Sequence, residues 1–151
     1  GAAIANILTG KTNPSGKLPV SLPRDAGQMP LFYNHKPSGM RSQFWGDYAD
    51  LKAGPLFPFG HGLSYTTFEY GALQCDGRMR TDGKLHVSIP VTNSGKIEGT
   101  EIVQLYVRDQ AGSVTRPVKE LKGFARVGLK PGETRTVSFL LDSSALAFTG
   151  L

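Results

Sequence analysis

Apolar and polar residues alternate along the C-terminal half of the chain, and this alternation is its clearest structural pattern. It is strongest in residues 84–91, 103–108 and 136–141. Successive side chains of a strand point to opposite faces of a sheet, so each stretch predicts a half-buried strand. Turn-forming sequences separate these stretches: TNSGKIEG, DQAGS and LKPGET. Short strands spaced in this way predict a two-sheet sandwich, of which residues 60–151 supply about five or six strands.

Prolines interrupt the pattern at two places. Pro90 lies within a predicted strand and has no N–H to donate, so we expect the backbone to face solvent or a bulge at that point. Near the N-terminus, Leu18, Val20 and Leu22 alternate with prolines on the other side, which predicts an edge strand or an extended segment pinned to a surface. We expect that surface to lie outside this chain.

The first ten residues, GAAIANILTG, predict a short helix. Ile4, Ile7 and Leu8 have helical spacing, and Gly10 stands where a helix would stop. No N-cap residue precedes them, so we expect the helix to be the later part of a longer one, and the chain to be a fragment.

Residues 34–58 show no periodicity and mix glycine, proline, charges and rings. Such a stretch is typical of a functional loop, a linker or disorder. We interpret it as a long loop that joins two domains.

Composition and charge exclude several kinds of site. The formal net charge is +5, but the 17 Lys and Arg residues are scattered, so we expect no nucleic-acid partner. Cys75 is the single cysteine and the three histidines are far apart, so we expect no disulfide and no metal site. We also expect no cofactor. No apolar run approaches the roughly 18 residues of a membrane span, so no membrane partner is expected.

The run PLFPFGHGLSYTTFEY, residues 55–70, is rich in aromatic side chains. Such rings suit the inside of a sheet and the wall of a sugar site equally well. Phe68 and Tyr70 lie on a strand-like stretch and are predicted to be core, whereas Phe57, Phe59 and Tyr65 are expected to seal a domain joint.

Five blocks, in this order along the chain, resemble one family, the glycoside hydrolase family 3 enzymes of the β-glucosidase and β-xylosidase group. Taken together they cover most of the chain and are highly specific. They are NPSGKLPVSLPRDAGQMP (13–30), FPFGHGLSYTTFEY (57–70), VTNSGKIEGTEIVQLYV (91–107), RPVKELKGF (116–124) and LKPGETRTVSF (129–139).

This resemblance implies a multidomain enzyme with a barrel-like domain, an α/β sandwich domain and a C-terminal fibronectin type III-like domain. The expected fold class is therefore mainly β: an immunoglobulin-like, fibronectin type III-like β-sandwich preceded by the terminal helix and strand edge of the α/β sandwich domain. Residues 1–34 correspond to that edge and residues 35–59 to the connecting loop. Residues 60–151 correspond to the β-sandwich, which we expect to lack its last strand.

The resemblance also implies that the full-length parent is a retaining β-glycosidase that hydrolyses O-glycosidic bonds of oligosaccharides. Such an enzyme needs two carboxyl groups roughly 5 to 5.5 Å apart. In the family, the nucleophile is an Asp of the first domain and the acid/base is commonly a Glu of the second, so we expect both upstream of Gly1 and no catalytic residue in this chain. Asp47 with Asp50, and Glu98 with Glu101, are interpreted as solvated loop and turn charges.

We therefore expect the chain to be the accessory C-terminal part of such an enzyme, with the N-terminal catalytic domains as its partner. Relatives are frequently periplasmic or secreted, and the same location is expected here. The alternative is a stand-alone fibronectin-like module that binds carbohydrate or protein. The loop DQAGSVTRP, residues 109–117, either lies free in solvent or contacts a partner or sister subunit, so a homodimer stays open.

The loop MRSQFWGDYAD, residues 40–50, holds the candidate substrate-binding residues. Phe44, Trp45 and Tyr48 offer stacking faces, whereas Arg41 and Asp47 offer hydrogen bonds to hydroxyls, as a sugar subsite requires. The alternative is that these rings pack against the missing domains.

Overall fold

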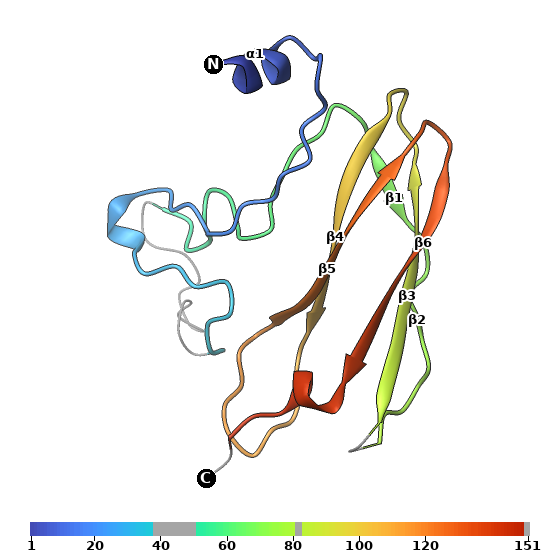
Figure 1. The fold of residues 1–151 in the computed structure, drawn as a ribbon. Coiled ribbons are helices and arrows are strands. Elements are labelled where there is room, and N and C mark those ends of the chain that lie inside the picture. The colour runs from blue at the N-terminus through green and yellow to red at the C-terminus, as the bar shows by residue number, and fades with distance from the viewer. Residues whose placement is uncertain (38–50, 81–82, 150–151) are drawn as a thin grey trace. The chain divides into compact units, whose positions relative to one another are not determined.

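The computed structural model describes residues 1–37, 51–80 and 83–149 (Figure 1). The described residues fall into two compact units, of which unit 1 is Gly1–Gly16, Leu63–Leu105 and Lys122–Phe148, and unit 2 is Lys17–Gly62, Tyr106–Leu121 and Thr149–Leu151. The elements are the helices α1 (Ala2–Leu8), η1 (Ala26–Gln28) and η2 (Ser143–Leu146) and the strands β1 (Phe68–Tyr70), β2 (Gln74–Cys75), β3 (Lys84–Asn93), β4 (Gly99–Val107), β5 (Glu120–Leu129) and β6 (Thr134–Asp142).

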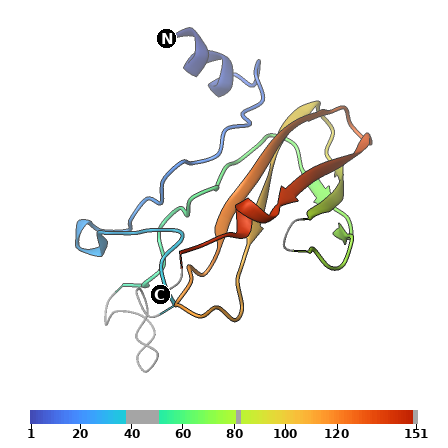
Figure 2. The ribbon, with the colours of Figure 1, turned by 60° about the horizontal axis from the view of Figure 1, so that its bottom comes forward.

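Strand β3 is the centre of the larger sheet of unit 1. Along one edge it pairs antiparallel with β6, from Lys84 opposite Asp142 to Thr92 opposite Thr134, and the two strands run side by side in Figure 1. Along the other edge it pairs with β1 and with β2. The second sheet consists, in the described part of the chain, of β4 and β5. After β6 the chain enters η2 (Figure 2).

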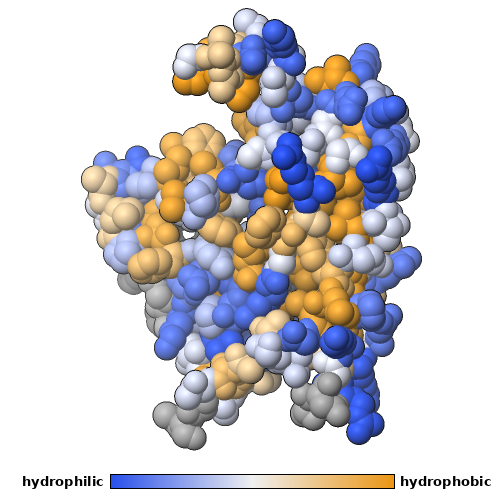
Figure 3. All heavy atoms as spheres, in the orientation of Figure 1, coloured by the Kyte–Doolittle hydropathy of each residue, from blue (hydrophilic) through white to orange (hydrophobic). Residues whose placement is uncertain are grey.

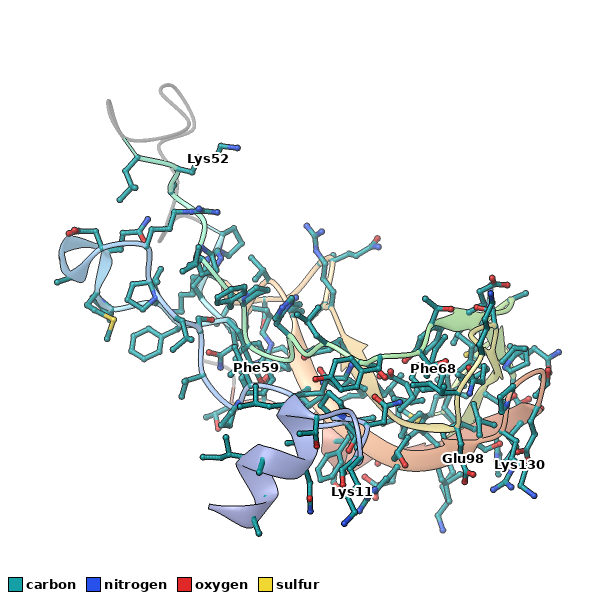
Figure 4. The ribbon with its side chains drawn as sticks, turned by 90° about the horizontal axis from the view of Figure 1, so that it is seen from above. Lys11, Lys52, Phe59, Phe68, Glu98 and Lys130 are labelled. Carbon is teal, nitrogen blue, oxygen red and sulfur yellow. The ribbon has the colours of Figure 1, made fainter. Side chains whose placement is uncertain are left out.

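The two sheets share one apolar core. It takes Val91 from β3 and Val137 from β6 on one side, and Val103 from β4 with Val127 and Leu129 from β5 on the other. Phe68, labelled in Figure 4, packs against this cluster. The predicted β-sandwich and its three alternating strands are therefore confirmed, because side chains from both sheets bury one common core.

The alternation of apolar and polar residues did not predict strand β5. Its core-facing residues are not all apolar, and its solvent-facing residues are not all polar. Its core-facing side includes Gly123, where an added Cβ would lie 3.1 Å from the ring of Phe139. Its solvent side includes Phe124, which is 71% exposed. The core face thus requires a small residue at Gly123, while a large ring lies on the solvent face at Phe124. The two-residue alternation of apolar and polar side chains is therefore not visible in the sequence of β5.

Pro90, which we expected to face solvent or a bulge, lies opposite a break in the neighbouring strand. Strand β1 ends at Tyr70 and β2 begins at Gln74, while the Gly71 amide donates to the Pro90 carbonyl at 2.9 Å. The nitrogen and carbonyl of a residue in an antiparallel strand point to the same edge. The missing proline donor therefore faces the interruption between β1 and β2, where it costs no ladder hydrogen bond.

Asn93 is fully buried and its side chain organises the end of the sandwich. Its Oδ1 accepts from Thr66 Oγ1 at 2.7 Å and from the Gly95 amide at 3.1 Å. Its Nδ2 donates to the carbonyls of Ile97 and Leu129 at 2.8 and 2.9 Å. All four hydrogen-bonding positions of this buried amide are thus satisfied, as burial of a polar group requires.

Two of the sequence interpretations about unit 1 are wrong. Glu101 is 7% exposed on the core side of β4, between Gly99 and Val103, and is not a solvated turn charge. Tyr70 is 48% exposed and is not core, although it pairs with the buried Val91. Burial, followed by the Glu101 carboxylate, to which the phenol hydrogen bonds, raises the pKa of Tyr70. The hydrogen bond between Tyr70 and Glu101 thus gives the buried carboxylate a polar partner at the edge of the core.

Unit 2 contains the proline-flanked segment, and its pairing partner is in this chain, contrary to our expectation. The amides of Leu18 and Leu22 donate to the carbonyls of His61 and Phe57, each at 2.8 Å. The amides of Leu56 and Gly60 donate back to the carbonyls of Leu22 and Leu18. The surface that pins this segment is therefore residues 56–61, which come about 40 residues later.

Replacing Gly95 by alanine is expected to destabilise the chain, because an added Cβ would collide with Thr66 Oγ1 and lie 2.8 Å from the Thr67 nitrogen. Overpacking of this kind costs about 1–3 kcal/mol. Urea denaturation followed by circular dichroism measures the loss of unfolding free energy. Gly16→Ala is the matched control, since no atom lies within 4 Å of its added Cβ. Equal denaturation midpoints for the two variants would show that the fold tolerates a side chain at position 95.

The pKa of Tyr70 predicts a loss of stability at alkaline pH. Because its folded pKa is raised above the ordinary value near 10, the native state keeps a proton that the unfolded chain loses. This contribution is present below about pH 10 and is lost as the pH rises through the folded pKa. Urea denaturation between about pH 9 and pH 11 should therefore show a shallower decline for Tyr70→Phe than for the parent chain. If the unfolding free energies of Tyr70→Phe and of the parent chain fell equally steeply with pH, the raised pKa of Tyr70 would not contribute to stability.

Candidate functional site

The candidate sugar-binding residues Arg41, Phe44, Trp45, Asp47 and Tyr48 lie outside the described residues, as does Asp50. The residues that flank this stretch in sequence are described. Pro37 on one side and residues 53–55 on the other line a pocket of unit 2.

This pocket, the aromatic pocket, has a volume of about 410 Å³. Rings and prolines form about half of its wall, and the Ser21 hydroxyl, the His35 imidazole and the Lys119 ammonium group provide polar groups. Phe59, labelled in Figure 4, is one of the rings. The lining residues are Ser21, Leu31, Phe32, Tyr33, His35, Pro37, Ala53, Gly54, Pro55, Pro58, Phe59, Val118 and Lys119.

Tyr33 is the residue around which the aromatic pocket is built. Its ring stacks on Phe59 with centroids 4.1 Å apart, and it meets Tyr106 edge-on at 6.2 Å. Its hydroxyl accepts from the Leu121 amide at 3.3 Å. One tyrosine thus joins residues from three separate parts of the sequence, because its ring offers two faces and its hydroxyl a polar handle.

Side chains at the pocket wall are held by neighbouring backbone groups. Ser21 Oγ accepts from the Phe59 amide at 3.1 Å, and His35 Nδ1 lies 2.8 Å from the Lys36 carbonyl. Lys119 Nζ stands 5.0 Å from the centroid of the Tyr106 ring, a cation–π distance. Burial, and to a lesser degree the Tyr33 phenol, raises the pKa of Tyr106. The shift favours the uncharged phenol, whose ring lies against the cation.

The buried side chain of Gln28 fixes the chain on the far side of residues 38–50. Its Oε1 accepts from the Arg24 amide at 2.6 Å, and its Nε2 donates to the Lys52 carbonyl at 2.7 Å. Arg24 Nε also donates to the Gly54 carbonyl at 3.1 Å. Residues 52–54, which lead into the pocket wall, are thus positioned by side chains from the η1 region.

A second polar site, the Asn13 clamp, joins distant segments of unit 1. Asn13 Oδ1 accepts from Ser64 Oγ and from the Tyr65 amide, both at 2.9 Å. Its Nδ2 donates to the Glu98 carbonyl at 3.2 Å. The Tyr65 hydroxyl donates to the Ile7 carbonyl at 2.8 Å, which adds α1 to the same network. Sequence reasoning interpreted Asn13 as a turn residue; the clamp has no local signature, because its partners lie 51 to 85 residues away.

Two further aromatic residues and one acidic residue considered in the sequence analysis are solvent-exposed. Phe57 is 39% exposed, and its ring stacks on His61 with centroids 5.0 Å apart. Tyr65 is 50% exposed. Glu98, labelled in Figure 4, is exposed, as predicted. Within residues 1–37, 51–80 and 83–149, no three His, Cys, Asp or Glu side chains gather as a metal site.

The loop between β4 and β5 is ordered by ion pairs of Arg116. Its guanidinium lies 2.8 Å from Glu120 and 3.9 Å from Asp109, while Asp109 Oδ1 accepts from the Ala111 amide at 3.1 Å. The loop surrounds an open depression of about 590 Å³. Among the helices in the described ranges, none has the length and apolar character needed to cross a membrane.

Comparison with known families and proteins agrees with this architecture. Residues 1–65 match the family model for the glycosyl hydrolase family 3 C-terminal domain, and residues 101–150 match that for a fibronectin type III-like domain. Helix α1 lies in the first of these regions, and most of β4 together with β5 and β6 lies in the second.

Individual relatives resemble nearly the whole chain. The periplasmic β-glucosidase of Salmonella typhimurium is 48% identical, covering 98% of this chain and 20% of its own length. A β-xylosidase of Formosa agariphila is 52% identical, covering 97% and 20%. The solved structure of a β-glucosidase from Erythrobacter marinus superposes with a TM-score of 0.90 at 46% identity, covering 98% and 19%.

The chain spans about a fifth of the length of the curated relatives that it matches. The two domain matches lie in the family's order, and the likeness to each relative extends over almost every residue of the chain. The chain therefore belongs to glycosyl hydrolase family 3, the family of these β-glucosidases and β-xylosidases, and corresponds to its C-terminal region.

Proposed function

We propose that this chain is the accessory C-terminal part of a β-glucosidase or β-xylosidase, and that it supports the catalytic domains of the same enzyme. The Asn13 clamp is the observation that carries this proposal. Its side chain bonds the segment that matches the family's C-terminal domain to the turn that opens β4 of the sandwich. A sandwich attached in this way acts as a buttress for that domain.

The chemistry is assigned to the full-length enzyme. It hydrolyses O-glycosidic bonds with retention, using two carboxyl groups about 5 to 5.5 Å apart. Both belong to the catalytic domains and not to this chain. Three of the acidic side chains have structural partners, since Glu101 bonds Tyr70 while Asp109 and Glu120 pair with Arg116.

The loop of residues 40–50 supplies a substrate subsite. Trp45, Phe44 and Tyr48 stack on sugar rings, while Arg41 and Asp47 hydrogen bond to hydroxyls. Two contacts after the loop support this assignment, because Gln28 and Arg24 hydrogen bond to the carbonyls of Lys52 and Gly54 and so fix the chain there. The enzyme works in the periplasm or outside the cell, as the name of the Salmonella relative indicates for that protein.

The proposal predicts that the full-length enzyme hydrolyses aryl β-glucosides or β-xylosides and that the 151-residue chain alone does not. In the full-length enzyme, Asn13→Ala removes three hydrogen bonds and should lower the half-inactivation temperature by about 2–8 °C. Asn34→Ala, at an exposed asparagine, is the matched control. Hydrolysis by the isolated chain, or equal inactivation of both variants, would contradict the accessory role. Binding of a glycan by the isolated chain would favour the stand-alone module.

The subsite predicts a change that depends on substrate length. Trp45→Ala in the full-length enzyme removes a stacking face, which is worth roughly 0.5–1.5 kcal/mol, or about two- to tenfold in kcat/KM for an oligosaccharide. An aryl monoglycoside, which does not reach the subsite, serves as the control substrate and should be unaffected. An unchanged kcat/KM for the oligosaccharide excludes the subsite.

A further inference from the structure

The aromatic pocket of unit 2 has a ring that is open to a ligand. Tyr33 and Phe59 stack on each other, so each of these rings has one face covered by the other. Phe32 also lines the pocket and is 61% exposed. Figure 3 shows apolar side chains beside polar ones on the visible face of residues 17–37, at the left of the view. The Phe32 ring is therefore the part of the wall on which a flat ligand can stack.

The polar groups of the aromatic pocket include both donors and an acceptor. His35 Nδ1 lies 2.8 Å from the Lys36 carbonyl, which can only accept, so Nδ1 carries the hydrogen and Nε2 of the neutral imidazole is an acceptor. Ser21 Oγ accepts from the Phe59 amide, and a hydroxyl that accepts one hydrogen bond still has its own hydrogen to donate. The Lys119 ammonium group adds further donors, and none of the described lining residues is acidic.

This combination limits the chemistry of the ligand. A wholly apolar ligand would leave the polar groups of the wall without partners, which costs free energy. An inorganic anion would leave the rings uncovered and would meet the acceptor Nε2 of His35. A pyranose ring suits both parts of the wall, because it has a face of C–H groups and an edge of hydroxyls that donate and accept. The pocket volume of about 410 Å³ lies within the range of small-molecule sites, roughly 300–1,000 Å³.

We infer that the aromatic pocket binds one sugar ring of a saccharide. The C–H face of the sugar lies on Phe32, and its hydroxyls bond to His35, Ser21 and Lys119. The lining residues define the class of ligand, whereas the choice of a saccharide of glucose or xylose rests on the proposed function. The site is built from residues 21–37, 53–59 and 118–119, and it includes no residue of the loop 40–50.

Titration calorimetry of the full-length enzyme with cellobiose and with xylobiose tests this site. The catalytic centre is first closed with a fluorinated glycoside, which traps the nucleophile of a retaining glycosidase as a long-lived covalent intermediate. Phe32→Ala then removes the stacking face and should weaken the remaining binding by about two- to tenfold. Phe124→Ala is the matched control and should leave the Kd unchanged, since Phe124 is 71% exposed on β5 and does not line the pocket.

Chemical modification of histidine gives a second measurement, which needs no variant. Diethyl pyrocarbonate reacts with neutral imidazole, and at His35 the nitrogen left to react is Nε2. The disaccharide at about ten times its Kd should slow the modification of His35 about tenfold, because about nine-tenths of the sites are then occupied. His86, exposed on β3 and outside the pocket, is the internal control and should react at an unchanged rate. Peptide mass spectrometry distinguishes the two residues.

Several results would overturn the inference. These are no binding to the trapped enzyme, equal affinities for the Phe32→Ala and Phe124→Ala variants, and no protection of His35. Modification of His35 at least about 100-fold slower in the saccharide-free native enzyme than in urea also overturns it, because another part of the enzyme then covers the pocket. Far-UV circular dichroism confirms that each variant is folded.

The same preparations separate this inference from the proposed function. An enzyme that neither reacts with the fluorinated glycoside nor hydrolyses aryl β-glucosides and β-xylosides contradicts the proposed function. Titration and histidine modification of that untrapped enzyme still test the pocket, since it leaves the disaccharide intact. Protection of His35 in such an enzyme supports the sugar site on its own.

Discussion

The sandwich depends on one buried side-chain amide, that of Asn93. After Asn93 the chain leaves the sheet of β3 and turns into β4 of the other sheet, and the Asn93 side chain bonds this turn at Gly95 and Ile97. The backbone of Asn93 also bonds the turn between β5 and β6, accepting from the Gly132 amide at 2.8 Å and donating to the Glu133 carbonyl at 3.0 Å. Both places at which the chain crosses between sheets are thus joined through one residue. Its burial makes these bonds costly to lose, because water cannot replace them.

The Asn13 clamp extends this organisation beyond the sandwich. Asn13 bonds the Glu98 carbonyl, next to Gly99, where an added Cβ would lie 2.7 Å from Asn13 Nδ2 and 2.6 Å from the Thr66 methyl. Thr66 in turn donates to Asn93. The separate sequence blocks that contain these residues therefore meet at one end of unit 1. Their spacing in the sequence reflects a shared network of hydrogen bonds and close packing.

Patterns with a short repeat were readable from the sequence, and contacts between distant residues were not. Alternation predicted β3, β4 and β6, and proline chemistry indicated an irregular place in the sheet at Pro90, where the neighbouring strand is interrupted. The same alternation contained the signal for the burial of Glu101, which is two residues before Val103 and therefore on the same face. The acidic side chain obscured it. The sequence gives no local signal for the Asn13 clamp or for the pairing of Leu18 and Leu22 with residues 57–61. These contacts join turn residues and backbone groups that are some 40 to 85 residues apart, and the sequence around each group does not indicate its partner.

Glycoside hydrolysis gives a physical reason for an accessory domain of this kind. A retaining mechanism requires two carboxyl groups held at a fixed separation, and a displacement of about 1 Å in such a site can cost 100-fold in rate. In our proposal the two groups stand on different domains, so their separation depends on how firmly those domains are held. The hydrogen bonds of Asn13 and Tyr65 hold the segment that matches the C-terminal domain against the sandwich, and they are directional, so they break when the partners slide. In the proposed function, these polar clamps steady the C-terminal domain, and with it the one carboxyl group that this domain is expected to carry.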